Sequence, residues 1–298
     1  MIRLGVKIDL FGRSDPDFSR GDSWSSVFNL LSELDILDLE IAASHRYITD
    51  RDVYKRFLQF LKVSPASYGI KVYSIHTYTG DISAQDEGAR QNAVDLVKRQ
   101  VEELCGYIRP EVAVVHPTGN SSITENAQDK EIRYAKCHQS LYEINGYCQK
   151  FGLKIAVENM RRKFSDEGLV QERIGCDVEE LADLVNQLGS ENVGICYDTG
   201  HANISHGPVF YDTIPICRDR ILLVHASDNF GRDDDHLIPG QGRIDWSRVF
   251  QQLKEIDFRG PVIVEAEPGK EVSLIQGFQD IGRFRGNFIG TRDGKANG

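Results

Sequence analysis

Nine side chains of this sequence are of the types that bind divalent metal ions. They are five histidines, two glutamates and two aspartates: His76, His116, Glu158, Asp198, His201, His225, Asp234, His236 and Glu265. Imidazole nitrogens and carboxylate oxygens are common protein ligands of Zn²⁺, Mn²⁺, Co²⁺ and Mg²⁺. The set therefore predicts a metal site that polarises oxygen atoms of a substrate.

Six of these residues stand where a short apolar run ends. The runs KVYSIH, VAVVH, KIAVE, VGICYD, ILLVH and VIVE end at residues 76, 116, 158, 198, 225 and 265, with gaps of 40, 42, 40, 27 and 40 residues. A strand followed by a helix that returns to the next strand takes about 30 residues or more. One ligand type at the end of each successive strand is what a metal site at the mouth of a (β/α)₈ barrel requires.

Apolar runs and turn signals alternate along the whole chain. Strands are expected near 2–9, 36–42, 70–76, 111–116, 153–158, 193–198, 221–226 and 261–266, and helices near 22–34, 50–62, 87–105, 126–150, 177–188, 207–218, 246–256 and 271–284. Such alternation predicts a parallel sheet, and its length predicts closure. An open doubly wound sheet would need a glycine-rich phosphate loop, but neither G-x-G-x-x-G nor G-x-x-x-x-G-K-[ST] occurs. We expect an α/β fold, a single-domain (β/α)₈ TIM barrel over residues 1–288, followed by a disordered tail at 289–298.

The composition limits the partners and the compartment. The 298 residues carry 35 basic and 45 acidic side chains, a formal charge of −10, so a nucleic acid is not an expected partner. The six cysteines contain no C-x-x-C pair and are expected to be core residues in a reducing compartment. No run of 18 apolar residues occurs, and the start MIRLGVKIDL lacks a signal-peptide pattern. We expect a cytoplasmic protein without a membrane segment.

Members of the ligand set also have structural alternatives. Asp198 can cap a short helix while His201 packs locally, instead of both facing the mouth of the barrel. Asp234 and His236 can face one ion if their segment is extended, but GRDDDH can also be a solvated acidic loop. A single histidine at a strand end is often a hydrogen-bonded structural residue.

The two glutamates end otherwise apolar strands. A carboxylate there is costly unless it is paired or coordinates a metal. Because strands five and eight lie on different sides of a closed barrel, Glu158 and Glu265 can flank one substrate and transfer protons from two sides. Helix capping or an ion pair with an arginine is the alternative. Arg161–Lys163 follow Glu158 closely, and can bind a phosphate or carboxylate of a substrate or form a solvated loop.

Several segments carry a resemblance to a known family. They are IH at 75–76, VVHP at 114–117, AVEN at 156–159, CYDTGH at 196–201, VHASDN at 224–229, DDHLIPGQGRIDW at 234–246 and IVEAEP at 263–268. With them the chain resembles the xylose isomerase-like TIM barrel superfamily, which groups sugar-phosphate isomerases and epimerases with endonuclease IV. The resemblance runs from the first strand to the last and implies the same barrel.

The resemblance also implies roles for the candidate residues. In epimerase-like members, one divalent metal is held at positions that match Glu158, Asp198, His225 and Glu265. The two glutamates then act as acid and base, and the histidine that matches His201 contacts the substrate. In endonuclease IV three zinc ions share nine ligands, and all are matched here: His76, His116 and Glu158 for one ion, Glu158, Asp198, His225 and Glu265 for a second, and His201, Asp234 and His236 for a third.

The expected function is that of a metal-dependent isomerase or epimerase of a sugar or sugar phosphate, whose metal-bound glutamates transfer a proton through an enediolate. The expected cofactor is a divalent metal, Mn²⁺, Mg²⁺, Co²⁺ or Zn²⁺, and two or three ions are an open alternative. A dehydratase or lyase acting on a cyclic polyol would share the first step. An endonuclease IV-like multi-zinc phosphodiesterase acting on abasic DNA and a sugar-binding protein without catalysis are further alternatives. A homo-oligomer is left open.

Overall fold

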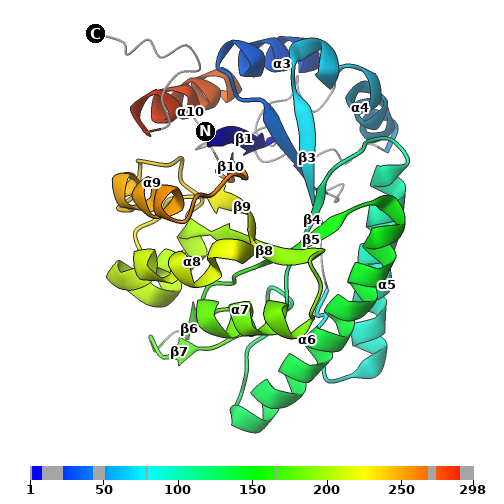
Figure 1. Ribbon diagram of the computed structural model, residues 1–298, viewed down its shortest axis with the longest axis vertical. Coiled ribbons are helices and arrows are strands. Elements are labelled where there is room, and N and C mark those ends of the chain that lie inside the picture. Colours follow the sequence, from blue (N-terminus) through cyan, green and yellow to red (C-terminus); the bar gives the residue numbers. More distant parts are fainter. Residues whose placement is uncertain are drawn as a thin grey trace.

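The strands close into a parallel barrel. The computed structural model describes residues 2–8, 23–42, 51–77, 80–165, 167–267 and 273–288. The barrel strands are β1 (Arg3–Lys7), β2 (Asp38–Ala42), β3 (Lys71–His76), β4 (Val112–Val115), β5 (Lys154–Glu158), β8 (Val193–Asp198), β9 (Ile221–Ala226) and β10 (Pro261–Val264). Their order is β1-β10-β9-β8-β5-β4-β3-β2, and all neighbours pair in parallel (Figure 1). The predicted α/β TIM barrel, a single domain, is confirmed.

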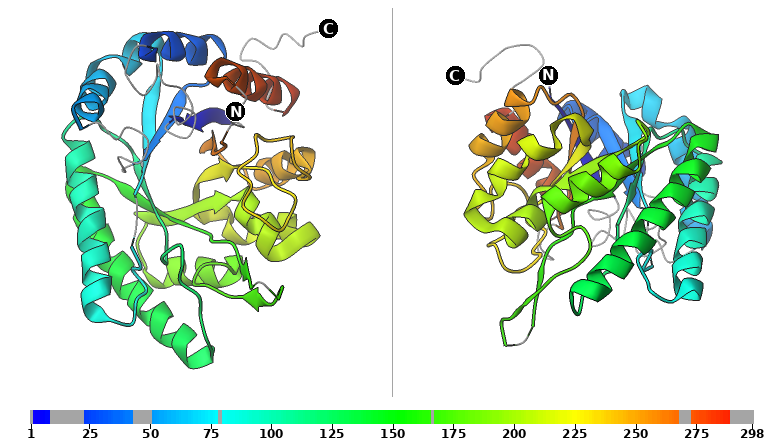
Figure 2. Two further views of the ribbon diagram at one scale, coloured as in Figure 1. Left: turned by 180° about the vertical axis from the view of Figure 1, so that it is seen from behind. Right: turned by 60° about the horizontal axis from the view of Figure 1, so that its bottom comes forward.

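Helices connect the strands and cover the outside of the barrel (Figure 2). They are α3 (Trp24–Glu33), α4 (Arg51–Val63), α5 (Glu87–Cys105), α6 (Ala127–Cys148), α7 (Val178–Gln187), α8 (Thr199–His206), α9 (Trp246–Glu255) and α10 (Leu274–Phe288). All but one of the predicted helical stretches coincide with one of these helices. The alternation of strand and helix that the sequence indicated is therefore the alternation of the fold.

The helix predicted near 207–218 is wrong. This segment forms two 3₁₀ helices, Gly207–Thr213 and Pro215–Arg220, and the α-helix of the connection is α8, directly after β8. Each 3₁₀ helix carries a proline in its first turn. A proline inside an α-helix removes a hydrogen bond and clashes with the preceding turn. The α-helix of this connection consequently ends before the first of these prolines.

Side-chain caps fix the starts of several helices. A side-chain oxygen accepts a hydrogen bond from a backbone N–H of the first turn in α5, α6, α7 and α9; the capping residues are Asp86, Asn126, Asp177 and Asp245. One such cap stabilises a helix by about 1 kcal/mol. The buried residues of α9 are Trp246, Val249, Phe250 and Leu253, which recur at the spacing of one helix face.

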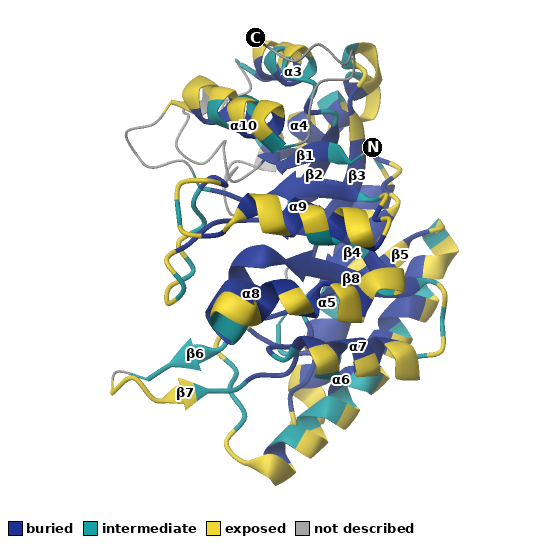
Figure 3. Ribbon diagram, turned by 60° about the vertical axis from the view of Figure 1, so that its left-hand side comes forward, coloured by how far each residue is buried: buried dark blue, intermediate teal, exposed yellow. Residues whose placement is uncertain are grey.

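Two apolar clusters lie on the two sides of the strands. The larger contains residues of the helices and of the strand faces that meet them. The smaller consists of Tyr73, Val112, Val114, Ala156, Cys196, Leu223 and Ile263. Because side chains alternate between the faces of a strand, the smaller cluster fills the barrel interior. Figure 3 shows the barrel strands as the buried centre of the molecule.

An irregularity between β2 and β3 changes which residues of β3 face the interior. Leu39 pairs with Val72, whereas Glu40 pairs with Ser74, so Tyr73 has no direct partner on β2. A β-bulge of this kind re-aims the side chains that follow it. Ser74 Oγ consequently donates a hydrogen bond to Glu40 Oε2 at 2.7 Å, in the interior of the barrel.

A hairpin that was not predicted follows β5. It pairs β6 (Lys163–Phe164) with β7 (Val170–Gln171) in antiparallel fashion and projects from the body of the molecule (Figure 3). The basic segment after Glu158, for which a solvated loop was one alternative, therefore enters a short ordered strand at Lys163.

The remaining expectations concern cysteines, membranes and the tail. All six cysteines are buried and free, which confirms their placement in the core. Within the described residues no helix is both long enough and apolar enough to cross a membrane. The predicted tail at 289–298 lies outside the described residues.

Candidate metal centre

The predicted ligands form a ring next to the apolar interior of the barrel. Five interior residues are followed, two positions later, by a candidate ligand: Val114 by His116, Ala156 by Glu158, Cys196 by Asp198, Leu223 by His225 and Ile263 by Glu265. Residues two apart in a strand share a face. These candidate side chains therefore face the interior at the carboxyl end of the strands, where barrel enzymes carry their active sites.

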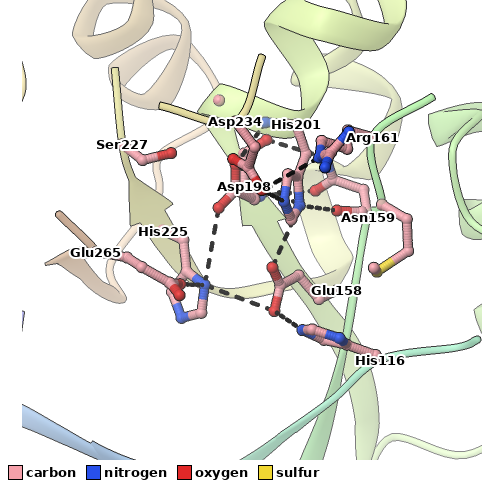
Figure 4. A network of polar contacts seen from close by, with 12 residues as sticks. His116, Glu158, Asn159, Arg161, Asp198, His201, His225, Ser227, Asp234 and Glu265 are labelled. Carbon is pink, nitrogen blue, oxygen red and sulfur yellow. Dashed lines mark hydrogen bonds and ion pairs between the residues drawn. The ribbon is translucent and has the colours of Figure 1, made fainter. Parts of the chain in front are cut away.

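Four of these residues converge on one point. One ligand atom from each of Glu158, Asp198, His225 and Glu265 lies within 4.8 Å of the other three. His225 Nδ1 lies 2.6 Å from Glu265 Oε2, 3.7 Å from Glu158 Oε2 and 4.0 Å from Asp198 Oδ2 (Figure 4). The group thus gathers residues from β5, β8, β9 and the end of β10.

Three of the converging atoms are buried without a hydrogen-bond partner. These atoms are Asp198 Oδ2, His225 Nδ1 and Glu265 Oε2. His225 Nδ1 and Glu265 Oε2 are close enough to form an ion pair, but their contact lacks hydrogen-bond geometry. A buried polar atom without a hydrogen bond costs about 1–3 kcal/mol, so three of them around one point need an explanation. One imidazole nitrogen and three carboxylates are a donor set that suits a divalent cation. The residues present therefore fit a metal ion.

Asp198 both caps a short helix and faces the mouth of the barrel, the two alternatives that the sequence left open. Its Oδ1 accepts a hydrogen bond from the His201 backbone N–H at 2.6 Å and caps α8, while Oδ2 belongs to the unpaired set. Asn159 holds the end of β8, because its Nδ2 donates to Asp198 O at 3.0 Å and its Oδ1 accepts from Asp198 N at 2.7 Å. A side chain at Gly200 would collide with Ser227 Oγ, so the second position of α8 must be a glycine.

His76 and His116 approach Glu158 from β3 and β4. Their Nε2 atoms lie 3.1 and 3.2 Å from Glu158 Oε2, and the three residues form a second group with ligand atoms within 4.8 Å of one another. The two rings meet edge to face at a centroid distance of 4.9 Å. Glu158 thus has the position expected of a bridging ligand, although His76 is also within hydrogen-bond distance of it.

The third predicted set does not close around one point. His201 Nε2 and His236 Nε2 lie 3.3 and 3.5 Å from Asp234 Oδ2, but among the described residues these three do not form a group with ligand atoms within 4.8 Å. Arg161 Nε lies 3.2 Å from the same Asp234 oxygen. A fixed guanidinium charge at this oxygen opposes the binding of a further cation.

His236 has a left-handed backbone conformation with φ 47°, which is uncommon for a residue other than glycine. An extended segment was the condition under which Asp234 and His236 could face one ion. The segment is not extended at His236. Glu267 N donates to His236 O at 2.8 Å, and His236 Nδ1 lies 3.3 Å from Glu265 O. The strained loop is held against the end of β10, next to the four converging residues.

Two buried charged residues belong to the site but were missed. Lys7 Nζ lies 2.6 Å from Glu265 Oε1 and 3.9 Å from Glu40 Oε1. Glu40 Oε2 in turn lies 3.1 Å from His225 Nε2. Both side chains orient a member of the converging group through the atom that does not face the centre. The available signal was a charge inside each of the apolar runs of β1 and β2.

The two glutamates are held in the charged form. Burial by itself raises the pKa of Glu158, but the imidazoles of His116 and His225 outweigh it and hold the pKa well below its usual value. Burial also raises the pKa of Glu265, and Lys7 together with His225 lowers it well below its usual value. Both residues are therefore carboxylates at neutral pH, the form that binds a cation and accepts a proton.

Asp198 is affected differently by the same surroundings. Burial, together with the charges of Glu158 and Glu265, raises the pKa of Asp198 to about 6, although His201 acts in the opposite direction. Like charges crowded into a buried site disfavour ionisation. A bound cation would reverse this balance and keep all three carboxylates charged.

Asp228 organises the loop between β9 and α9. Its Oδ1 accepts from Asn229 N at 2.9 Å and Ile244 N at 3.1 Å, and its Oδ2 accepts from Gly240 N at 2.8 Å and Trp246 Nε1 at 2.9 Å. Four hydrogen bonds to a buried carboxylate tie both ends of the loop to α9. The loop that carries Asp234 and His236 is thus anchored by an aspartate outside the predicted set.

Comparison with known proteins places this arrangement in a family. Residues 21–279 match the family model of the xylose isomerase-like TIM barrel. An uncharacterized protein of Methanocaldococcus jannaschii is 30% identical over 64% of this chain, and the match spans 63% of that protein's length. A D-psicose 3-epimerase of Enterocloster bolteae is 24% identical over 78% of this chain and 72% of that protein.

A solved structure of the IOLI protein with a bound zinc atom has the same fold. It aligns with a TM-score of 0.77 at 18% identity, over 96% of this chain and 97% of that chain. At this identity the likeness concerns the fold alone. The family match covers nearly the whole barrel and includes all nine candidate residues. The chain therefore belongs to the xylose isomerase-like TIM barrel family.

Proposed function

We propose that this protein is a metal-dependent isomerase or epimerase of a small sugar or sugar derivative. The proposal is carried by the convergence of Glu158, Asp198, His225 and Glu265, three of which have a buried atom without a hydrogen bond. A family relative that is a sugar epimerase supports this class of reaction. The site, rather than the barrel alone, is the warrant, because one fold serves many functions.

The four converging residues would hold one divalent ion at the mouth of the barrel. When bound, such an ion would polarise the carbonyl oxygen of the substrate and stabilise the negative charge that develops there. Lys7 holds Glu265, and Glu40 holds His225, through the atoms that face away from the centre. These contacts set the orientation of the ligands before substrate arrives.

Glu158 and Glu265 are the two acid–base groups in this proposal. Around the barrel β5 and β10 are separated by β8 and β9, so the two carboxylates approach a substrate from different sides. One carboxylate takes the proton from the carbon beside the carbonyl, which gives an enediolate, and the other, once protonated, delivers a proton. Delivery to the opposite face of the same carbon is epimerisation. Delivery to the neighbouring carbon, with a proton also passing from one substrate oxygen to the other, is isomerisation.

A multi-metal phosphodiesterase is the second candidate, because His76, His116 and Glu158 form a further group of ligand atoms. That candidate needs the third set to hold an ion as well. The Arg161 guanidinium at Asp234 argues against this. Cleavage of abasic DNA, with no reaction on sugars, would favour the phosphodiesterase.

Solvent deuterium incorporation tests the proposed function. The metal-loaded protein is incubated in D₂O with a panel of ketoses and ketose phosphates, and exchange at carbon is followed by NMR. We expect exchange with at least one sugar, and a loss of about 100-fold or more in Glu265→Gln when rates are compared per bound metal ion at saturating metal, because Glu265 is also a proposed ligand. Glu255→Gln, on the exposed face of α9, is the control and should keep the wild-type rate. Wild-type exchange in Glu265→Gln would remove Glu265 from the reaction.

A further inference from the structure

We propose that Arg161, Lys163 and Arg173, at the base of the β6–β7 hairpin, form a subsite for a phosphate group of the substrate. The inference rests on the proposed function, because it names the substrate class of the same site: a phosphorylated sugar. One of the three cations is a buried arginine without an acidic partner, and the other two lie beside it.

Arg173 is the cation whose burial needs an explanation. It is 3% exposed, its Nη2 donates to Gly119 O at 2.7 Å, and its Nε has no hydrogen-bond partner. Among the described residues no carboxylate lies within ion-pair distance of this guanidinium. A buried charge without a counter-ion is costly. An anionic ligand would supply the missing counter-charge.

The hairpin brings the other two cations to the same place. Lys163 pairs with Gln171 across the hairpin, and Arg161 and Arg173 stand two residues closer to the barrel on the two arms. Met160 N donates to Gly175 O at 2.8 Å and closes the base of the hairpin. Residues opposite one another, or two apart on one arm, share a face of an extended hairpin.

The subsite adjoins the metal centre through Arg161. Its Nε lies 3.2 Å from Asp234 Oδ2, and Asp234 lies 3.3 Å from His201 Nε2. Figure 4 shows Arg161 beside His201 and Asp234, above the converging ligands. A substrate with one group at Arg161 therefore lies beside residues that adjoin the centre.

The acidic groups near Arg173 already form ion pairs with neighbouring cations. Asp234 pairs with Arg161 itself, whereas Glu172 is shared by Arg162 at 3.7 Å and Lys130 at 3.3 Å. Burial, followed by the charge of Arg161, lowers the pKa of Arg173 to about 10, while Asp234 and Asp81 offset this only in part.

The same crowding acts on the lysine of the hairpin. Burial lowers the pKa of Lys163, and the charges of Arg173 and Arg161 lower it further. The three cations thus repel one another in this structure.

A phosphate group fits this arrangement better than a carboxylate. A phosphate monoester carries a charge of about −1.5 to −2 at neutral pH and several strong acceptor oxygens, which suits more than one cation. Anchoring the phosphate at the hairpin would leave the sugar carbons over the metal centre. Binding energy from this remote group can then position the reacting carbon.

Calorimetric titration of the metal-loaded protein with inorganic phosphate tests the subsite. We expect saturable binding in the wild type, at least about tenfold weaker binding in Lys163→Gln and Arg173→Gln, and weaker binding of acetate than of phosphate. Lys154→Gln removes an exposed lysine at the opposite end of β5 and should leave phosphate binding unchanged. Lys163 lies on the projecting hairpin, so Lys163→Gln decides the matter even if Arg173→Gln does not fold.

Three results would overturn the subsite. They are no saturable phosphate binding in the wild type, wild-type phosphate affinity in Lys163→Gln, and acetate binding as tight as phosphate binding. Wild-type affinity in the variant would place the phosphate on the metal instead. Failure of the proposed function gives a different pattern: no deuterium exchange with any sugar, but phosphate binding that Lys163→Gln still weakens.

Discussion

At the scale of single residues, the site is defined by buried atoms that face one another without hydrogen bonds. Sequence alone indicated all four converging residues, because each ends an apolar run in a strand. It did not indicate Lys7 and Glu40, because their inward orientation depends on strand register. For Glu40 it also depends on the pairing with β3 next to the bulge. Whether a charge within an apolar run faces the interior or the helices cannot be decided before the register is known.

Lys7 offers a test at this scale. Its Nζ lies 2.6 Å from Glu265 Oε1, so it fixes the carboxylate whose other oxygen faces the centre. Lys7→Met should lower kcat or metal affinity by about 10- to 100-fold, as is typical for a residue that orients a metal ligand. Turnover and metal content are measured side by side. Lys254→Met, which changes an exposed lysine of α9, is the control; equal behaviour of the two variants would exclude the orienting role.

At the scale of elements, the connections at the carboxyl end of the barrel depart most from the expectations. α8 begins directly at a site residue, because Asp198 serves both as its cap and as a candidate ligand. The β6–β7 hairpin has only two residues in each strand, too few for a recognisable alternation. Long regular helices and strands were predictable from period and caps, whereas these short elements depend on tertiary contacts.

The loop between β9 and α9 depends on Asp228. Asp228→Ala would leave the backbone N–H groups of Gly240 and Ile244 and the indole N–H of Trp246 without their buried acceptor. We expect the free energy of unfolding to fall by about 3 kcal/mol, as measured by urea denaturation. Asp233→Ala, at an exposed position of the same loop, should change it by less than about 0.5 kcal/mol. Similar losses in both variants would contradict the anchoring role.

A second aspartate joins two other loops of this end. Asp81 accepts from Ser83 Oγ at 2.6 Å, Ser122 Oγ at 2.6 Å and Gly119 N at 3.3 Å, and pairs with Arg133 at 2.9 Å. Burial raises the pKa of Asp81, but the hydrogen bonds from Ser122 and Ser83 outweigh it, so the net shift is downward. Its stabilising effect is therefore complete above the ordinary pKa of about 4 and disappears as the pH falls through the lowered value.

Asp81→Asn should consequently destabilise the protein by about 1–3 kcal/mol at pH 7, and the difference from wild type should shrink as the pH falls below about 4. Denaturation at a series of pH values measures this. Asp219→Asn removes an exposed carboxylate and should show neither effect. A difference that stays constant between pH 7 and pH 3 would mean that the ionised carboxylate is not the stabilising species.

At the scale of the whole molecule, closure of the barrel brings the candidate ligands together. Glu158 and His225 are 67 residues apart in the chain, yet only β8 separates their strands around the barrel. The sequence could predict this juxtaposition because successive apolar runs are far enough apart for one strand and one helix each, and each run ends in a ligand type. It could not predict that Arg161 would lie at Asp234, because that contact joins two irregular loops.

The measurement that tests the central claim most directly is the metal content of the purified protein and of His225→Gln, by elemental analysis after desalting. If Glu158, Asp198, His225 and Glu265 share one divalent ion, the wild type should retain about one tightly bound ion per chain that His225→Gln loses. His138→Gln, which changes a histidine on α6 away from the barrel mouth, should keep it. A wild type that retains no divalent metal, or a His225→Gln variant with wild-type metal content, would contradict the account.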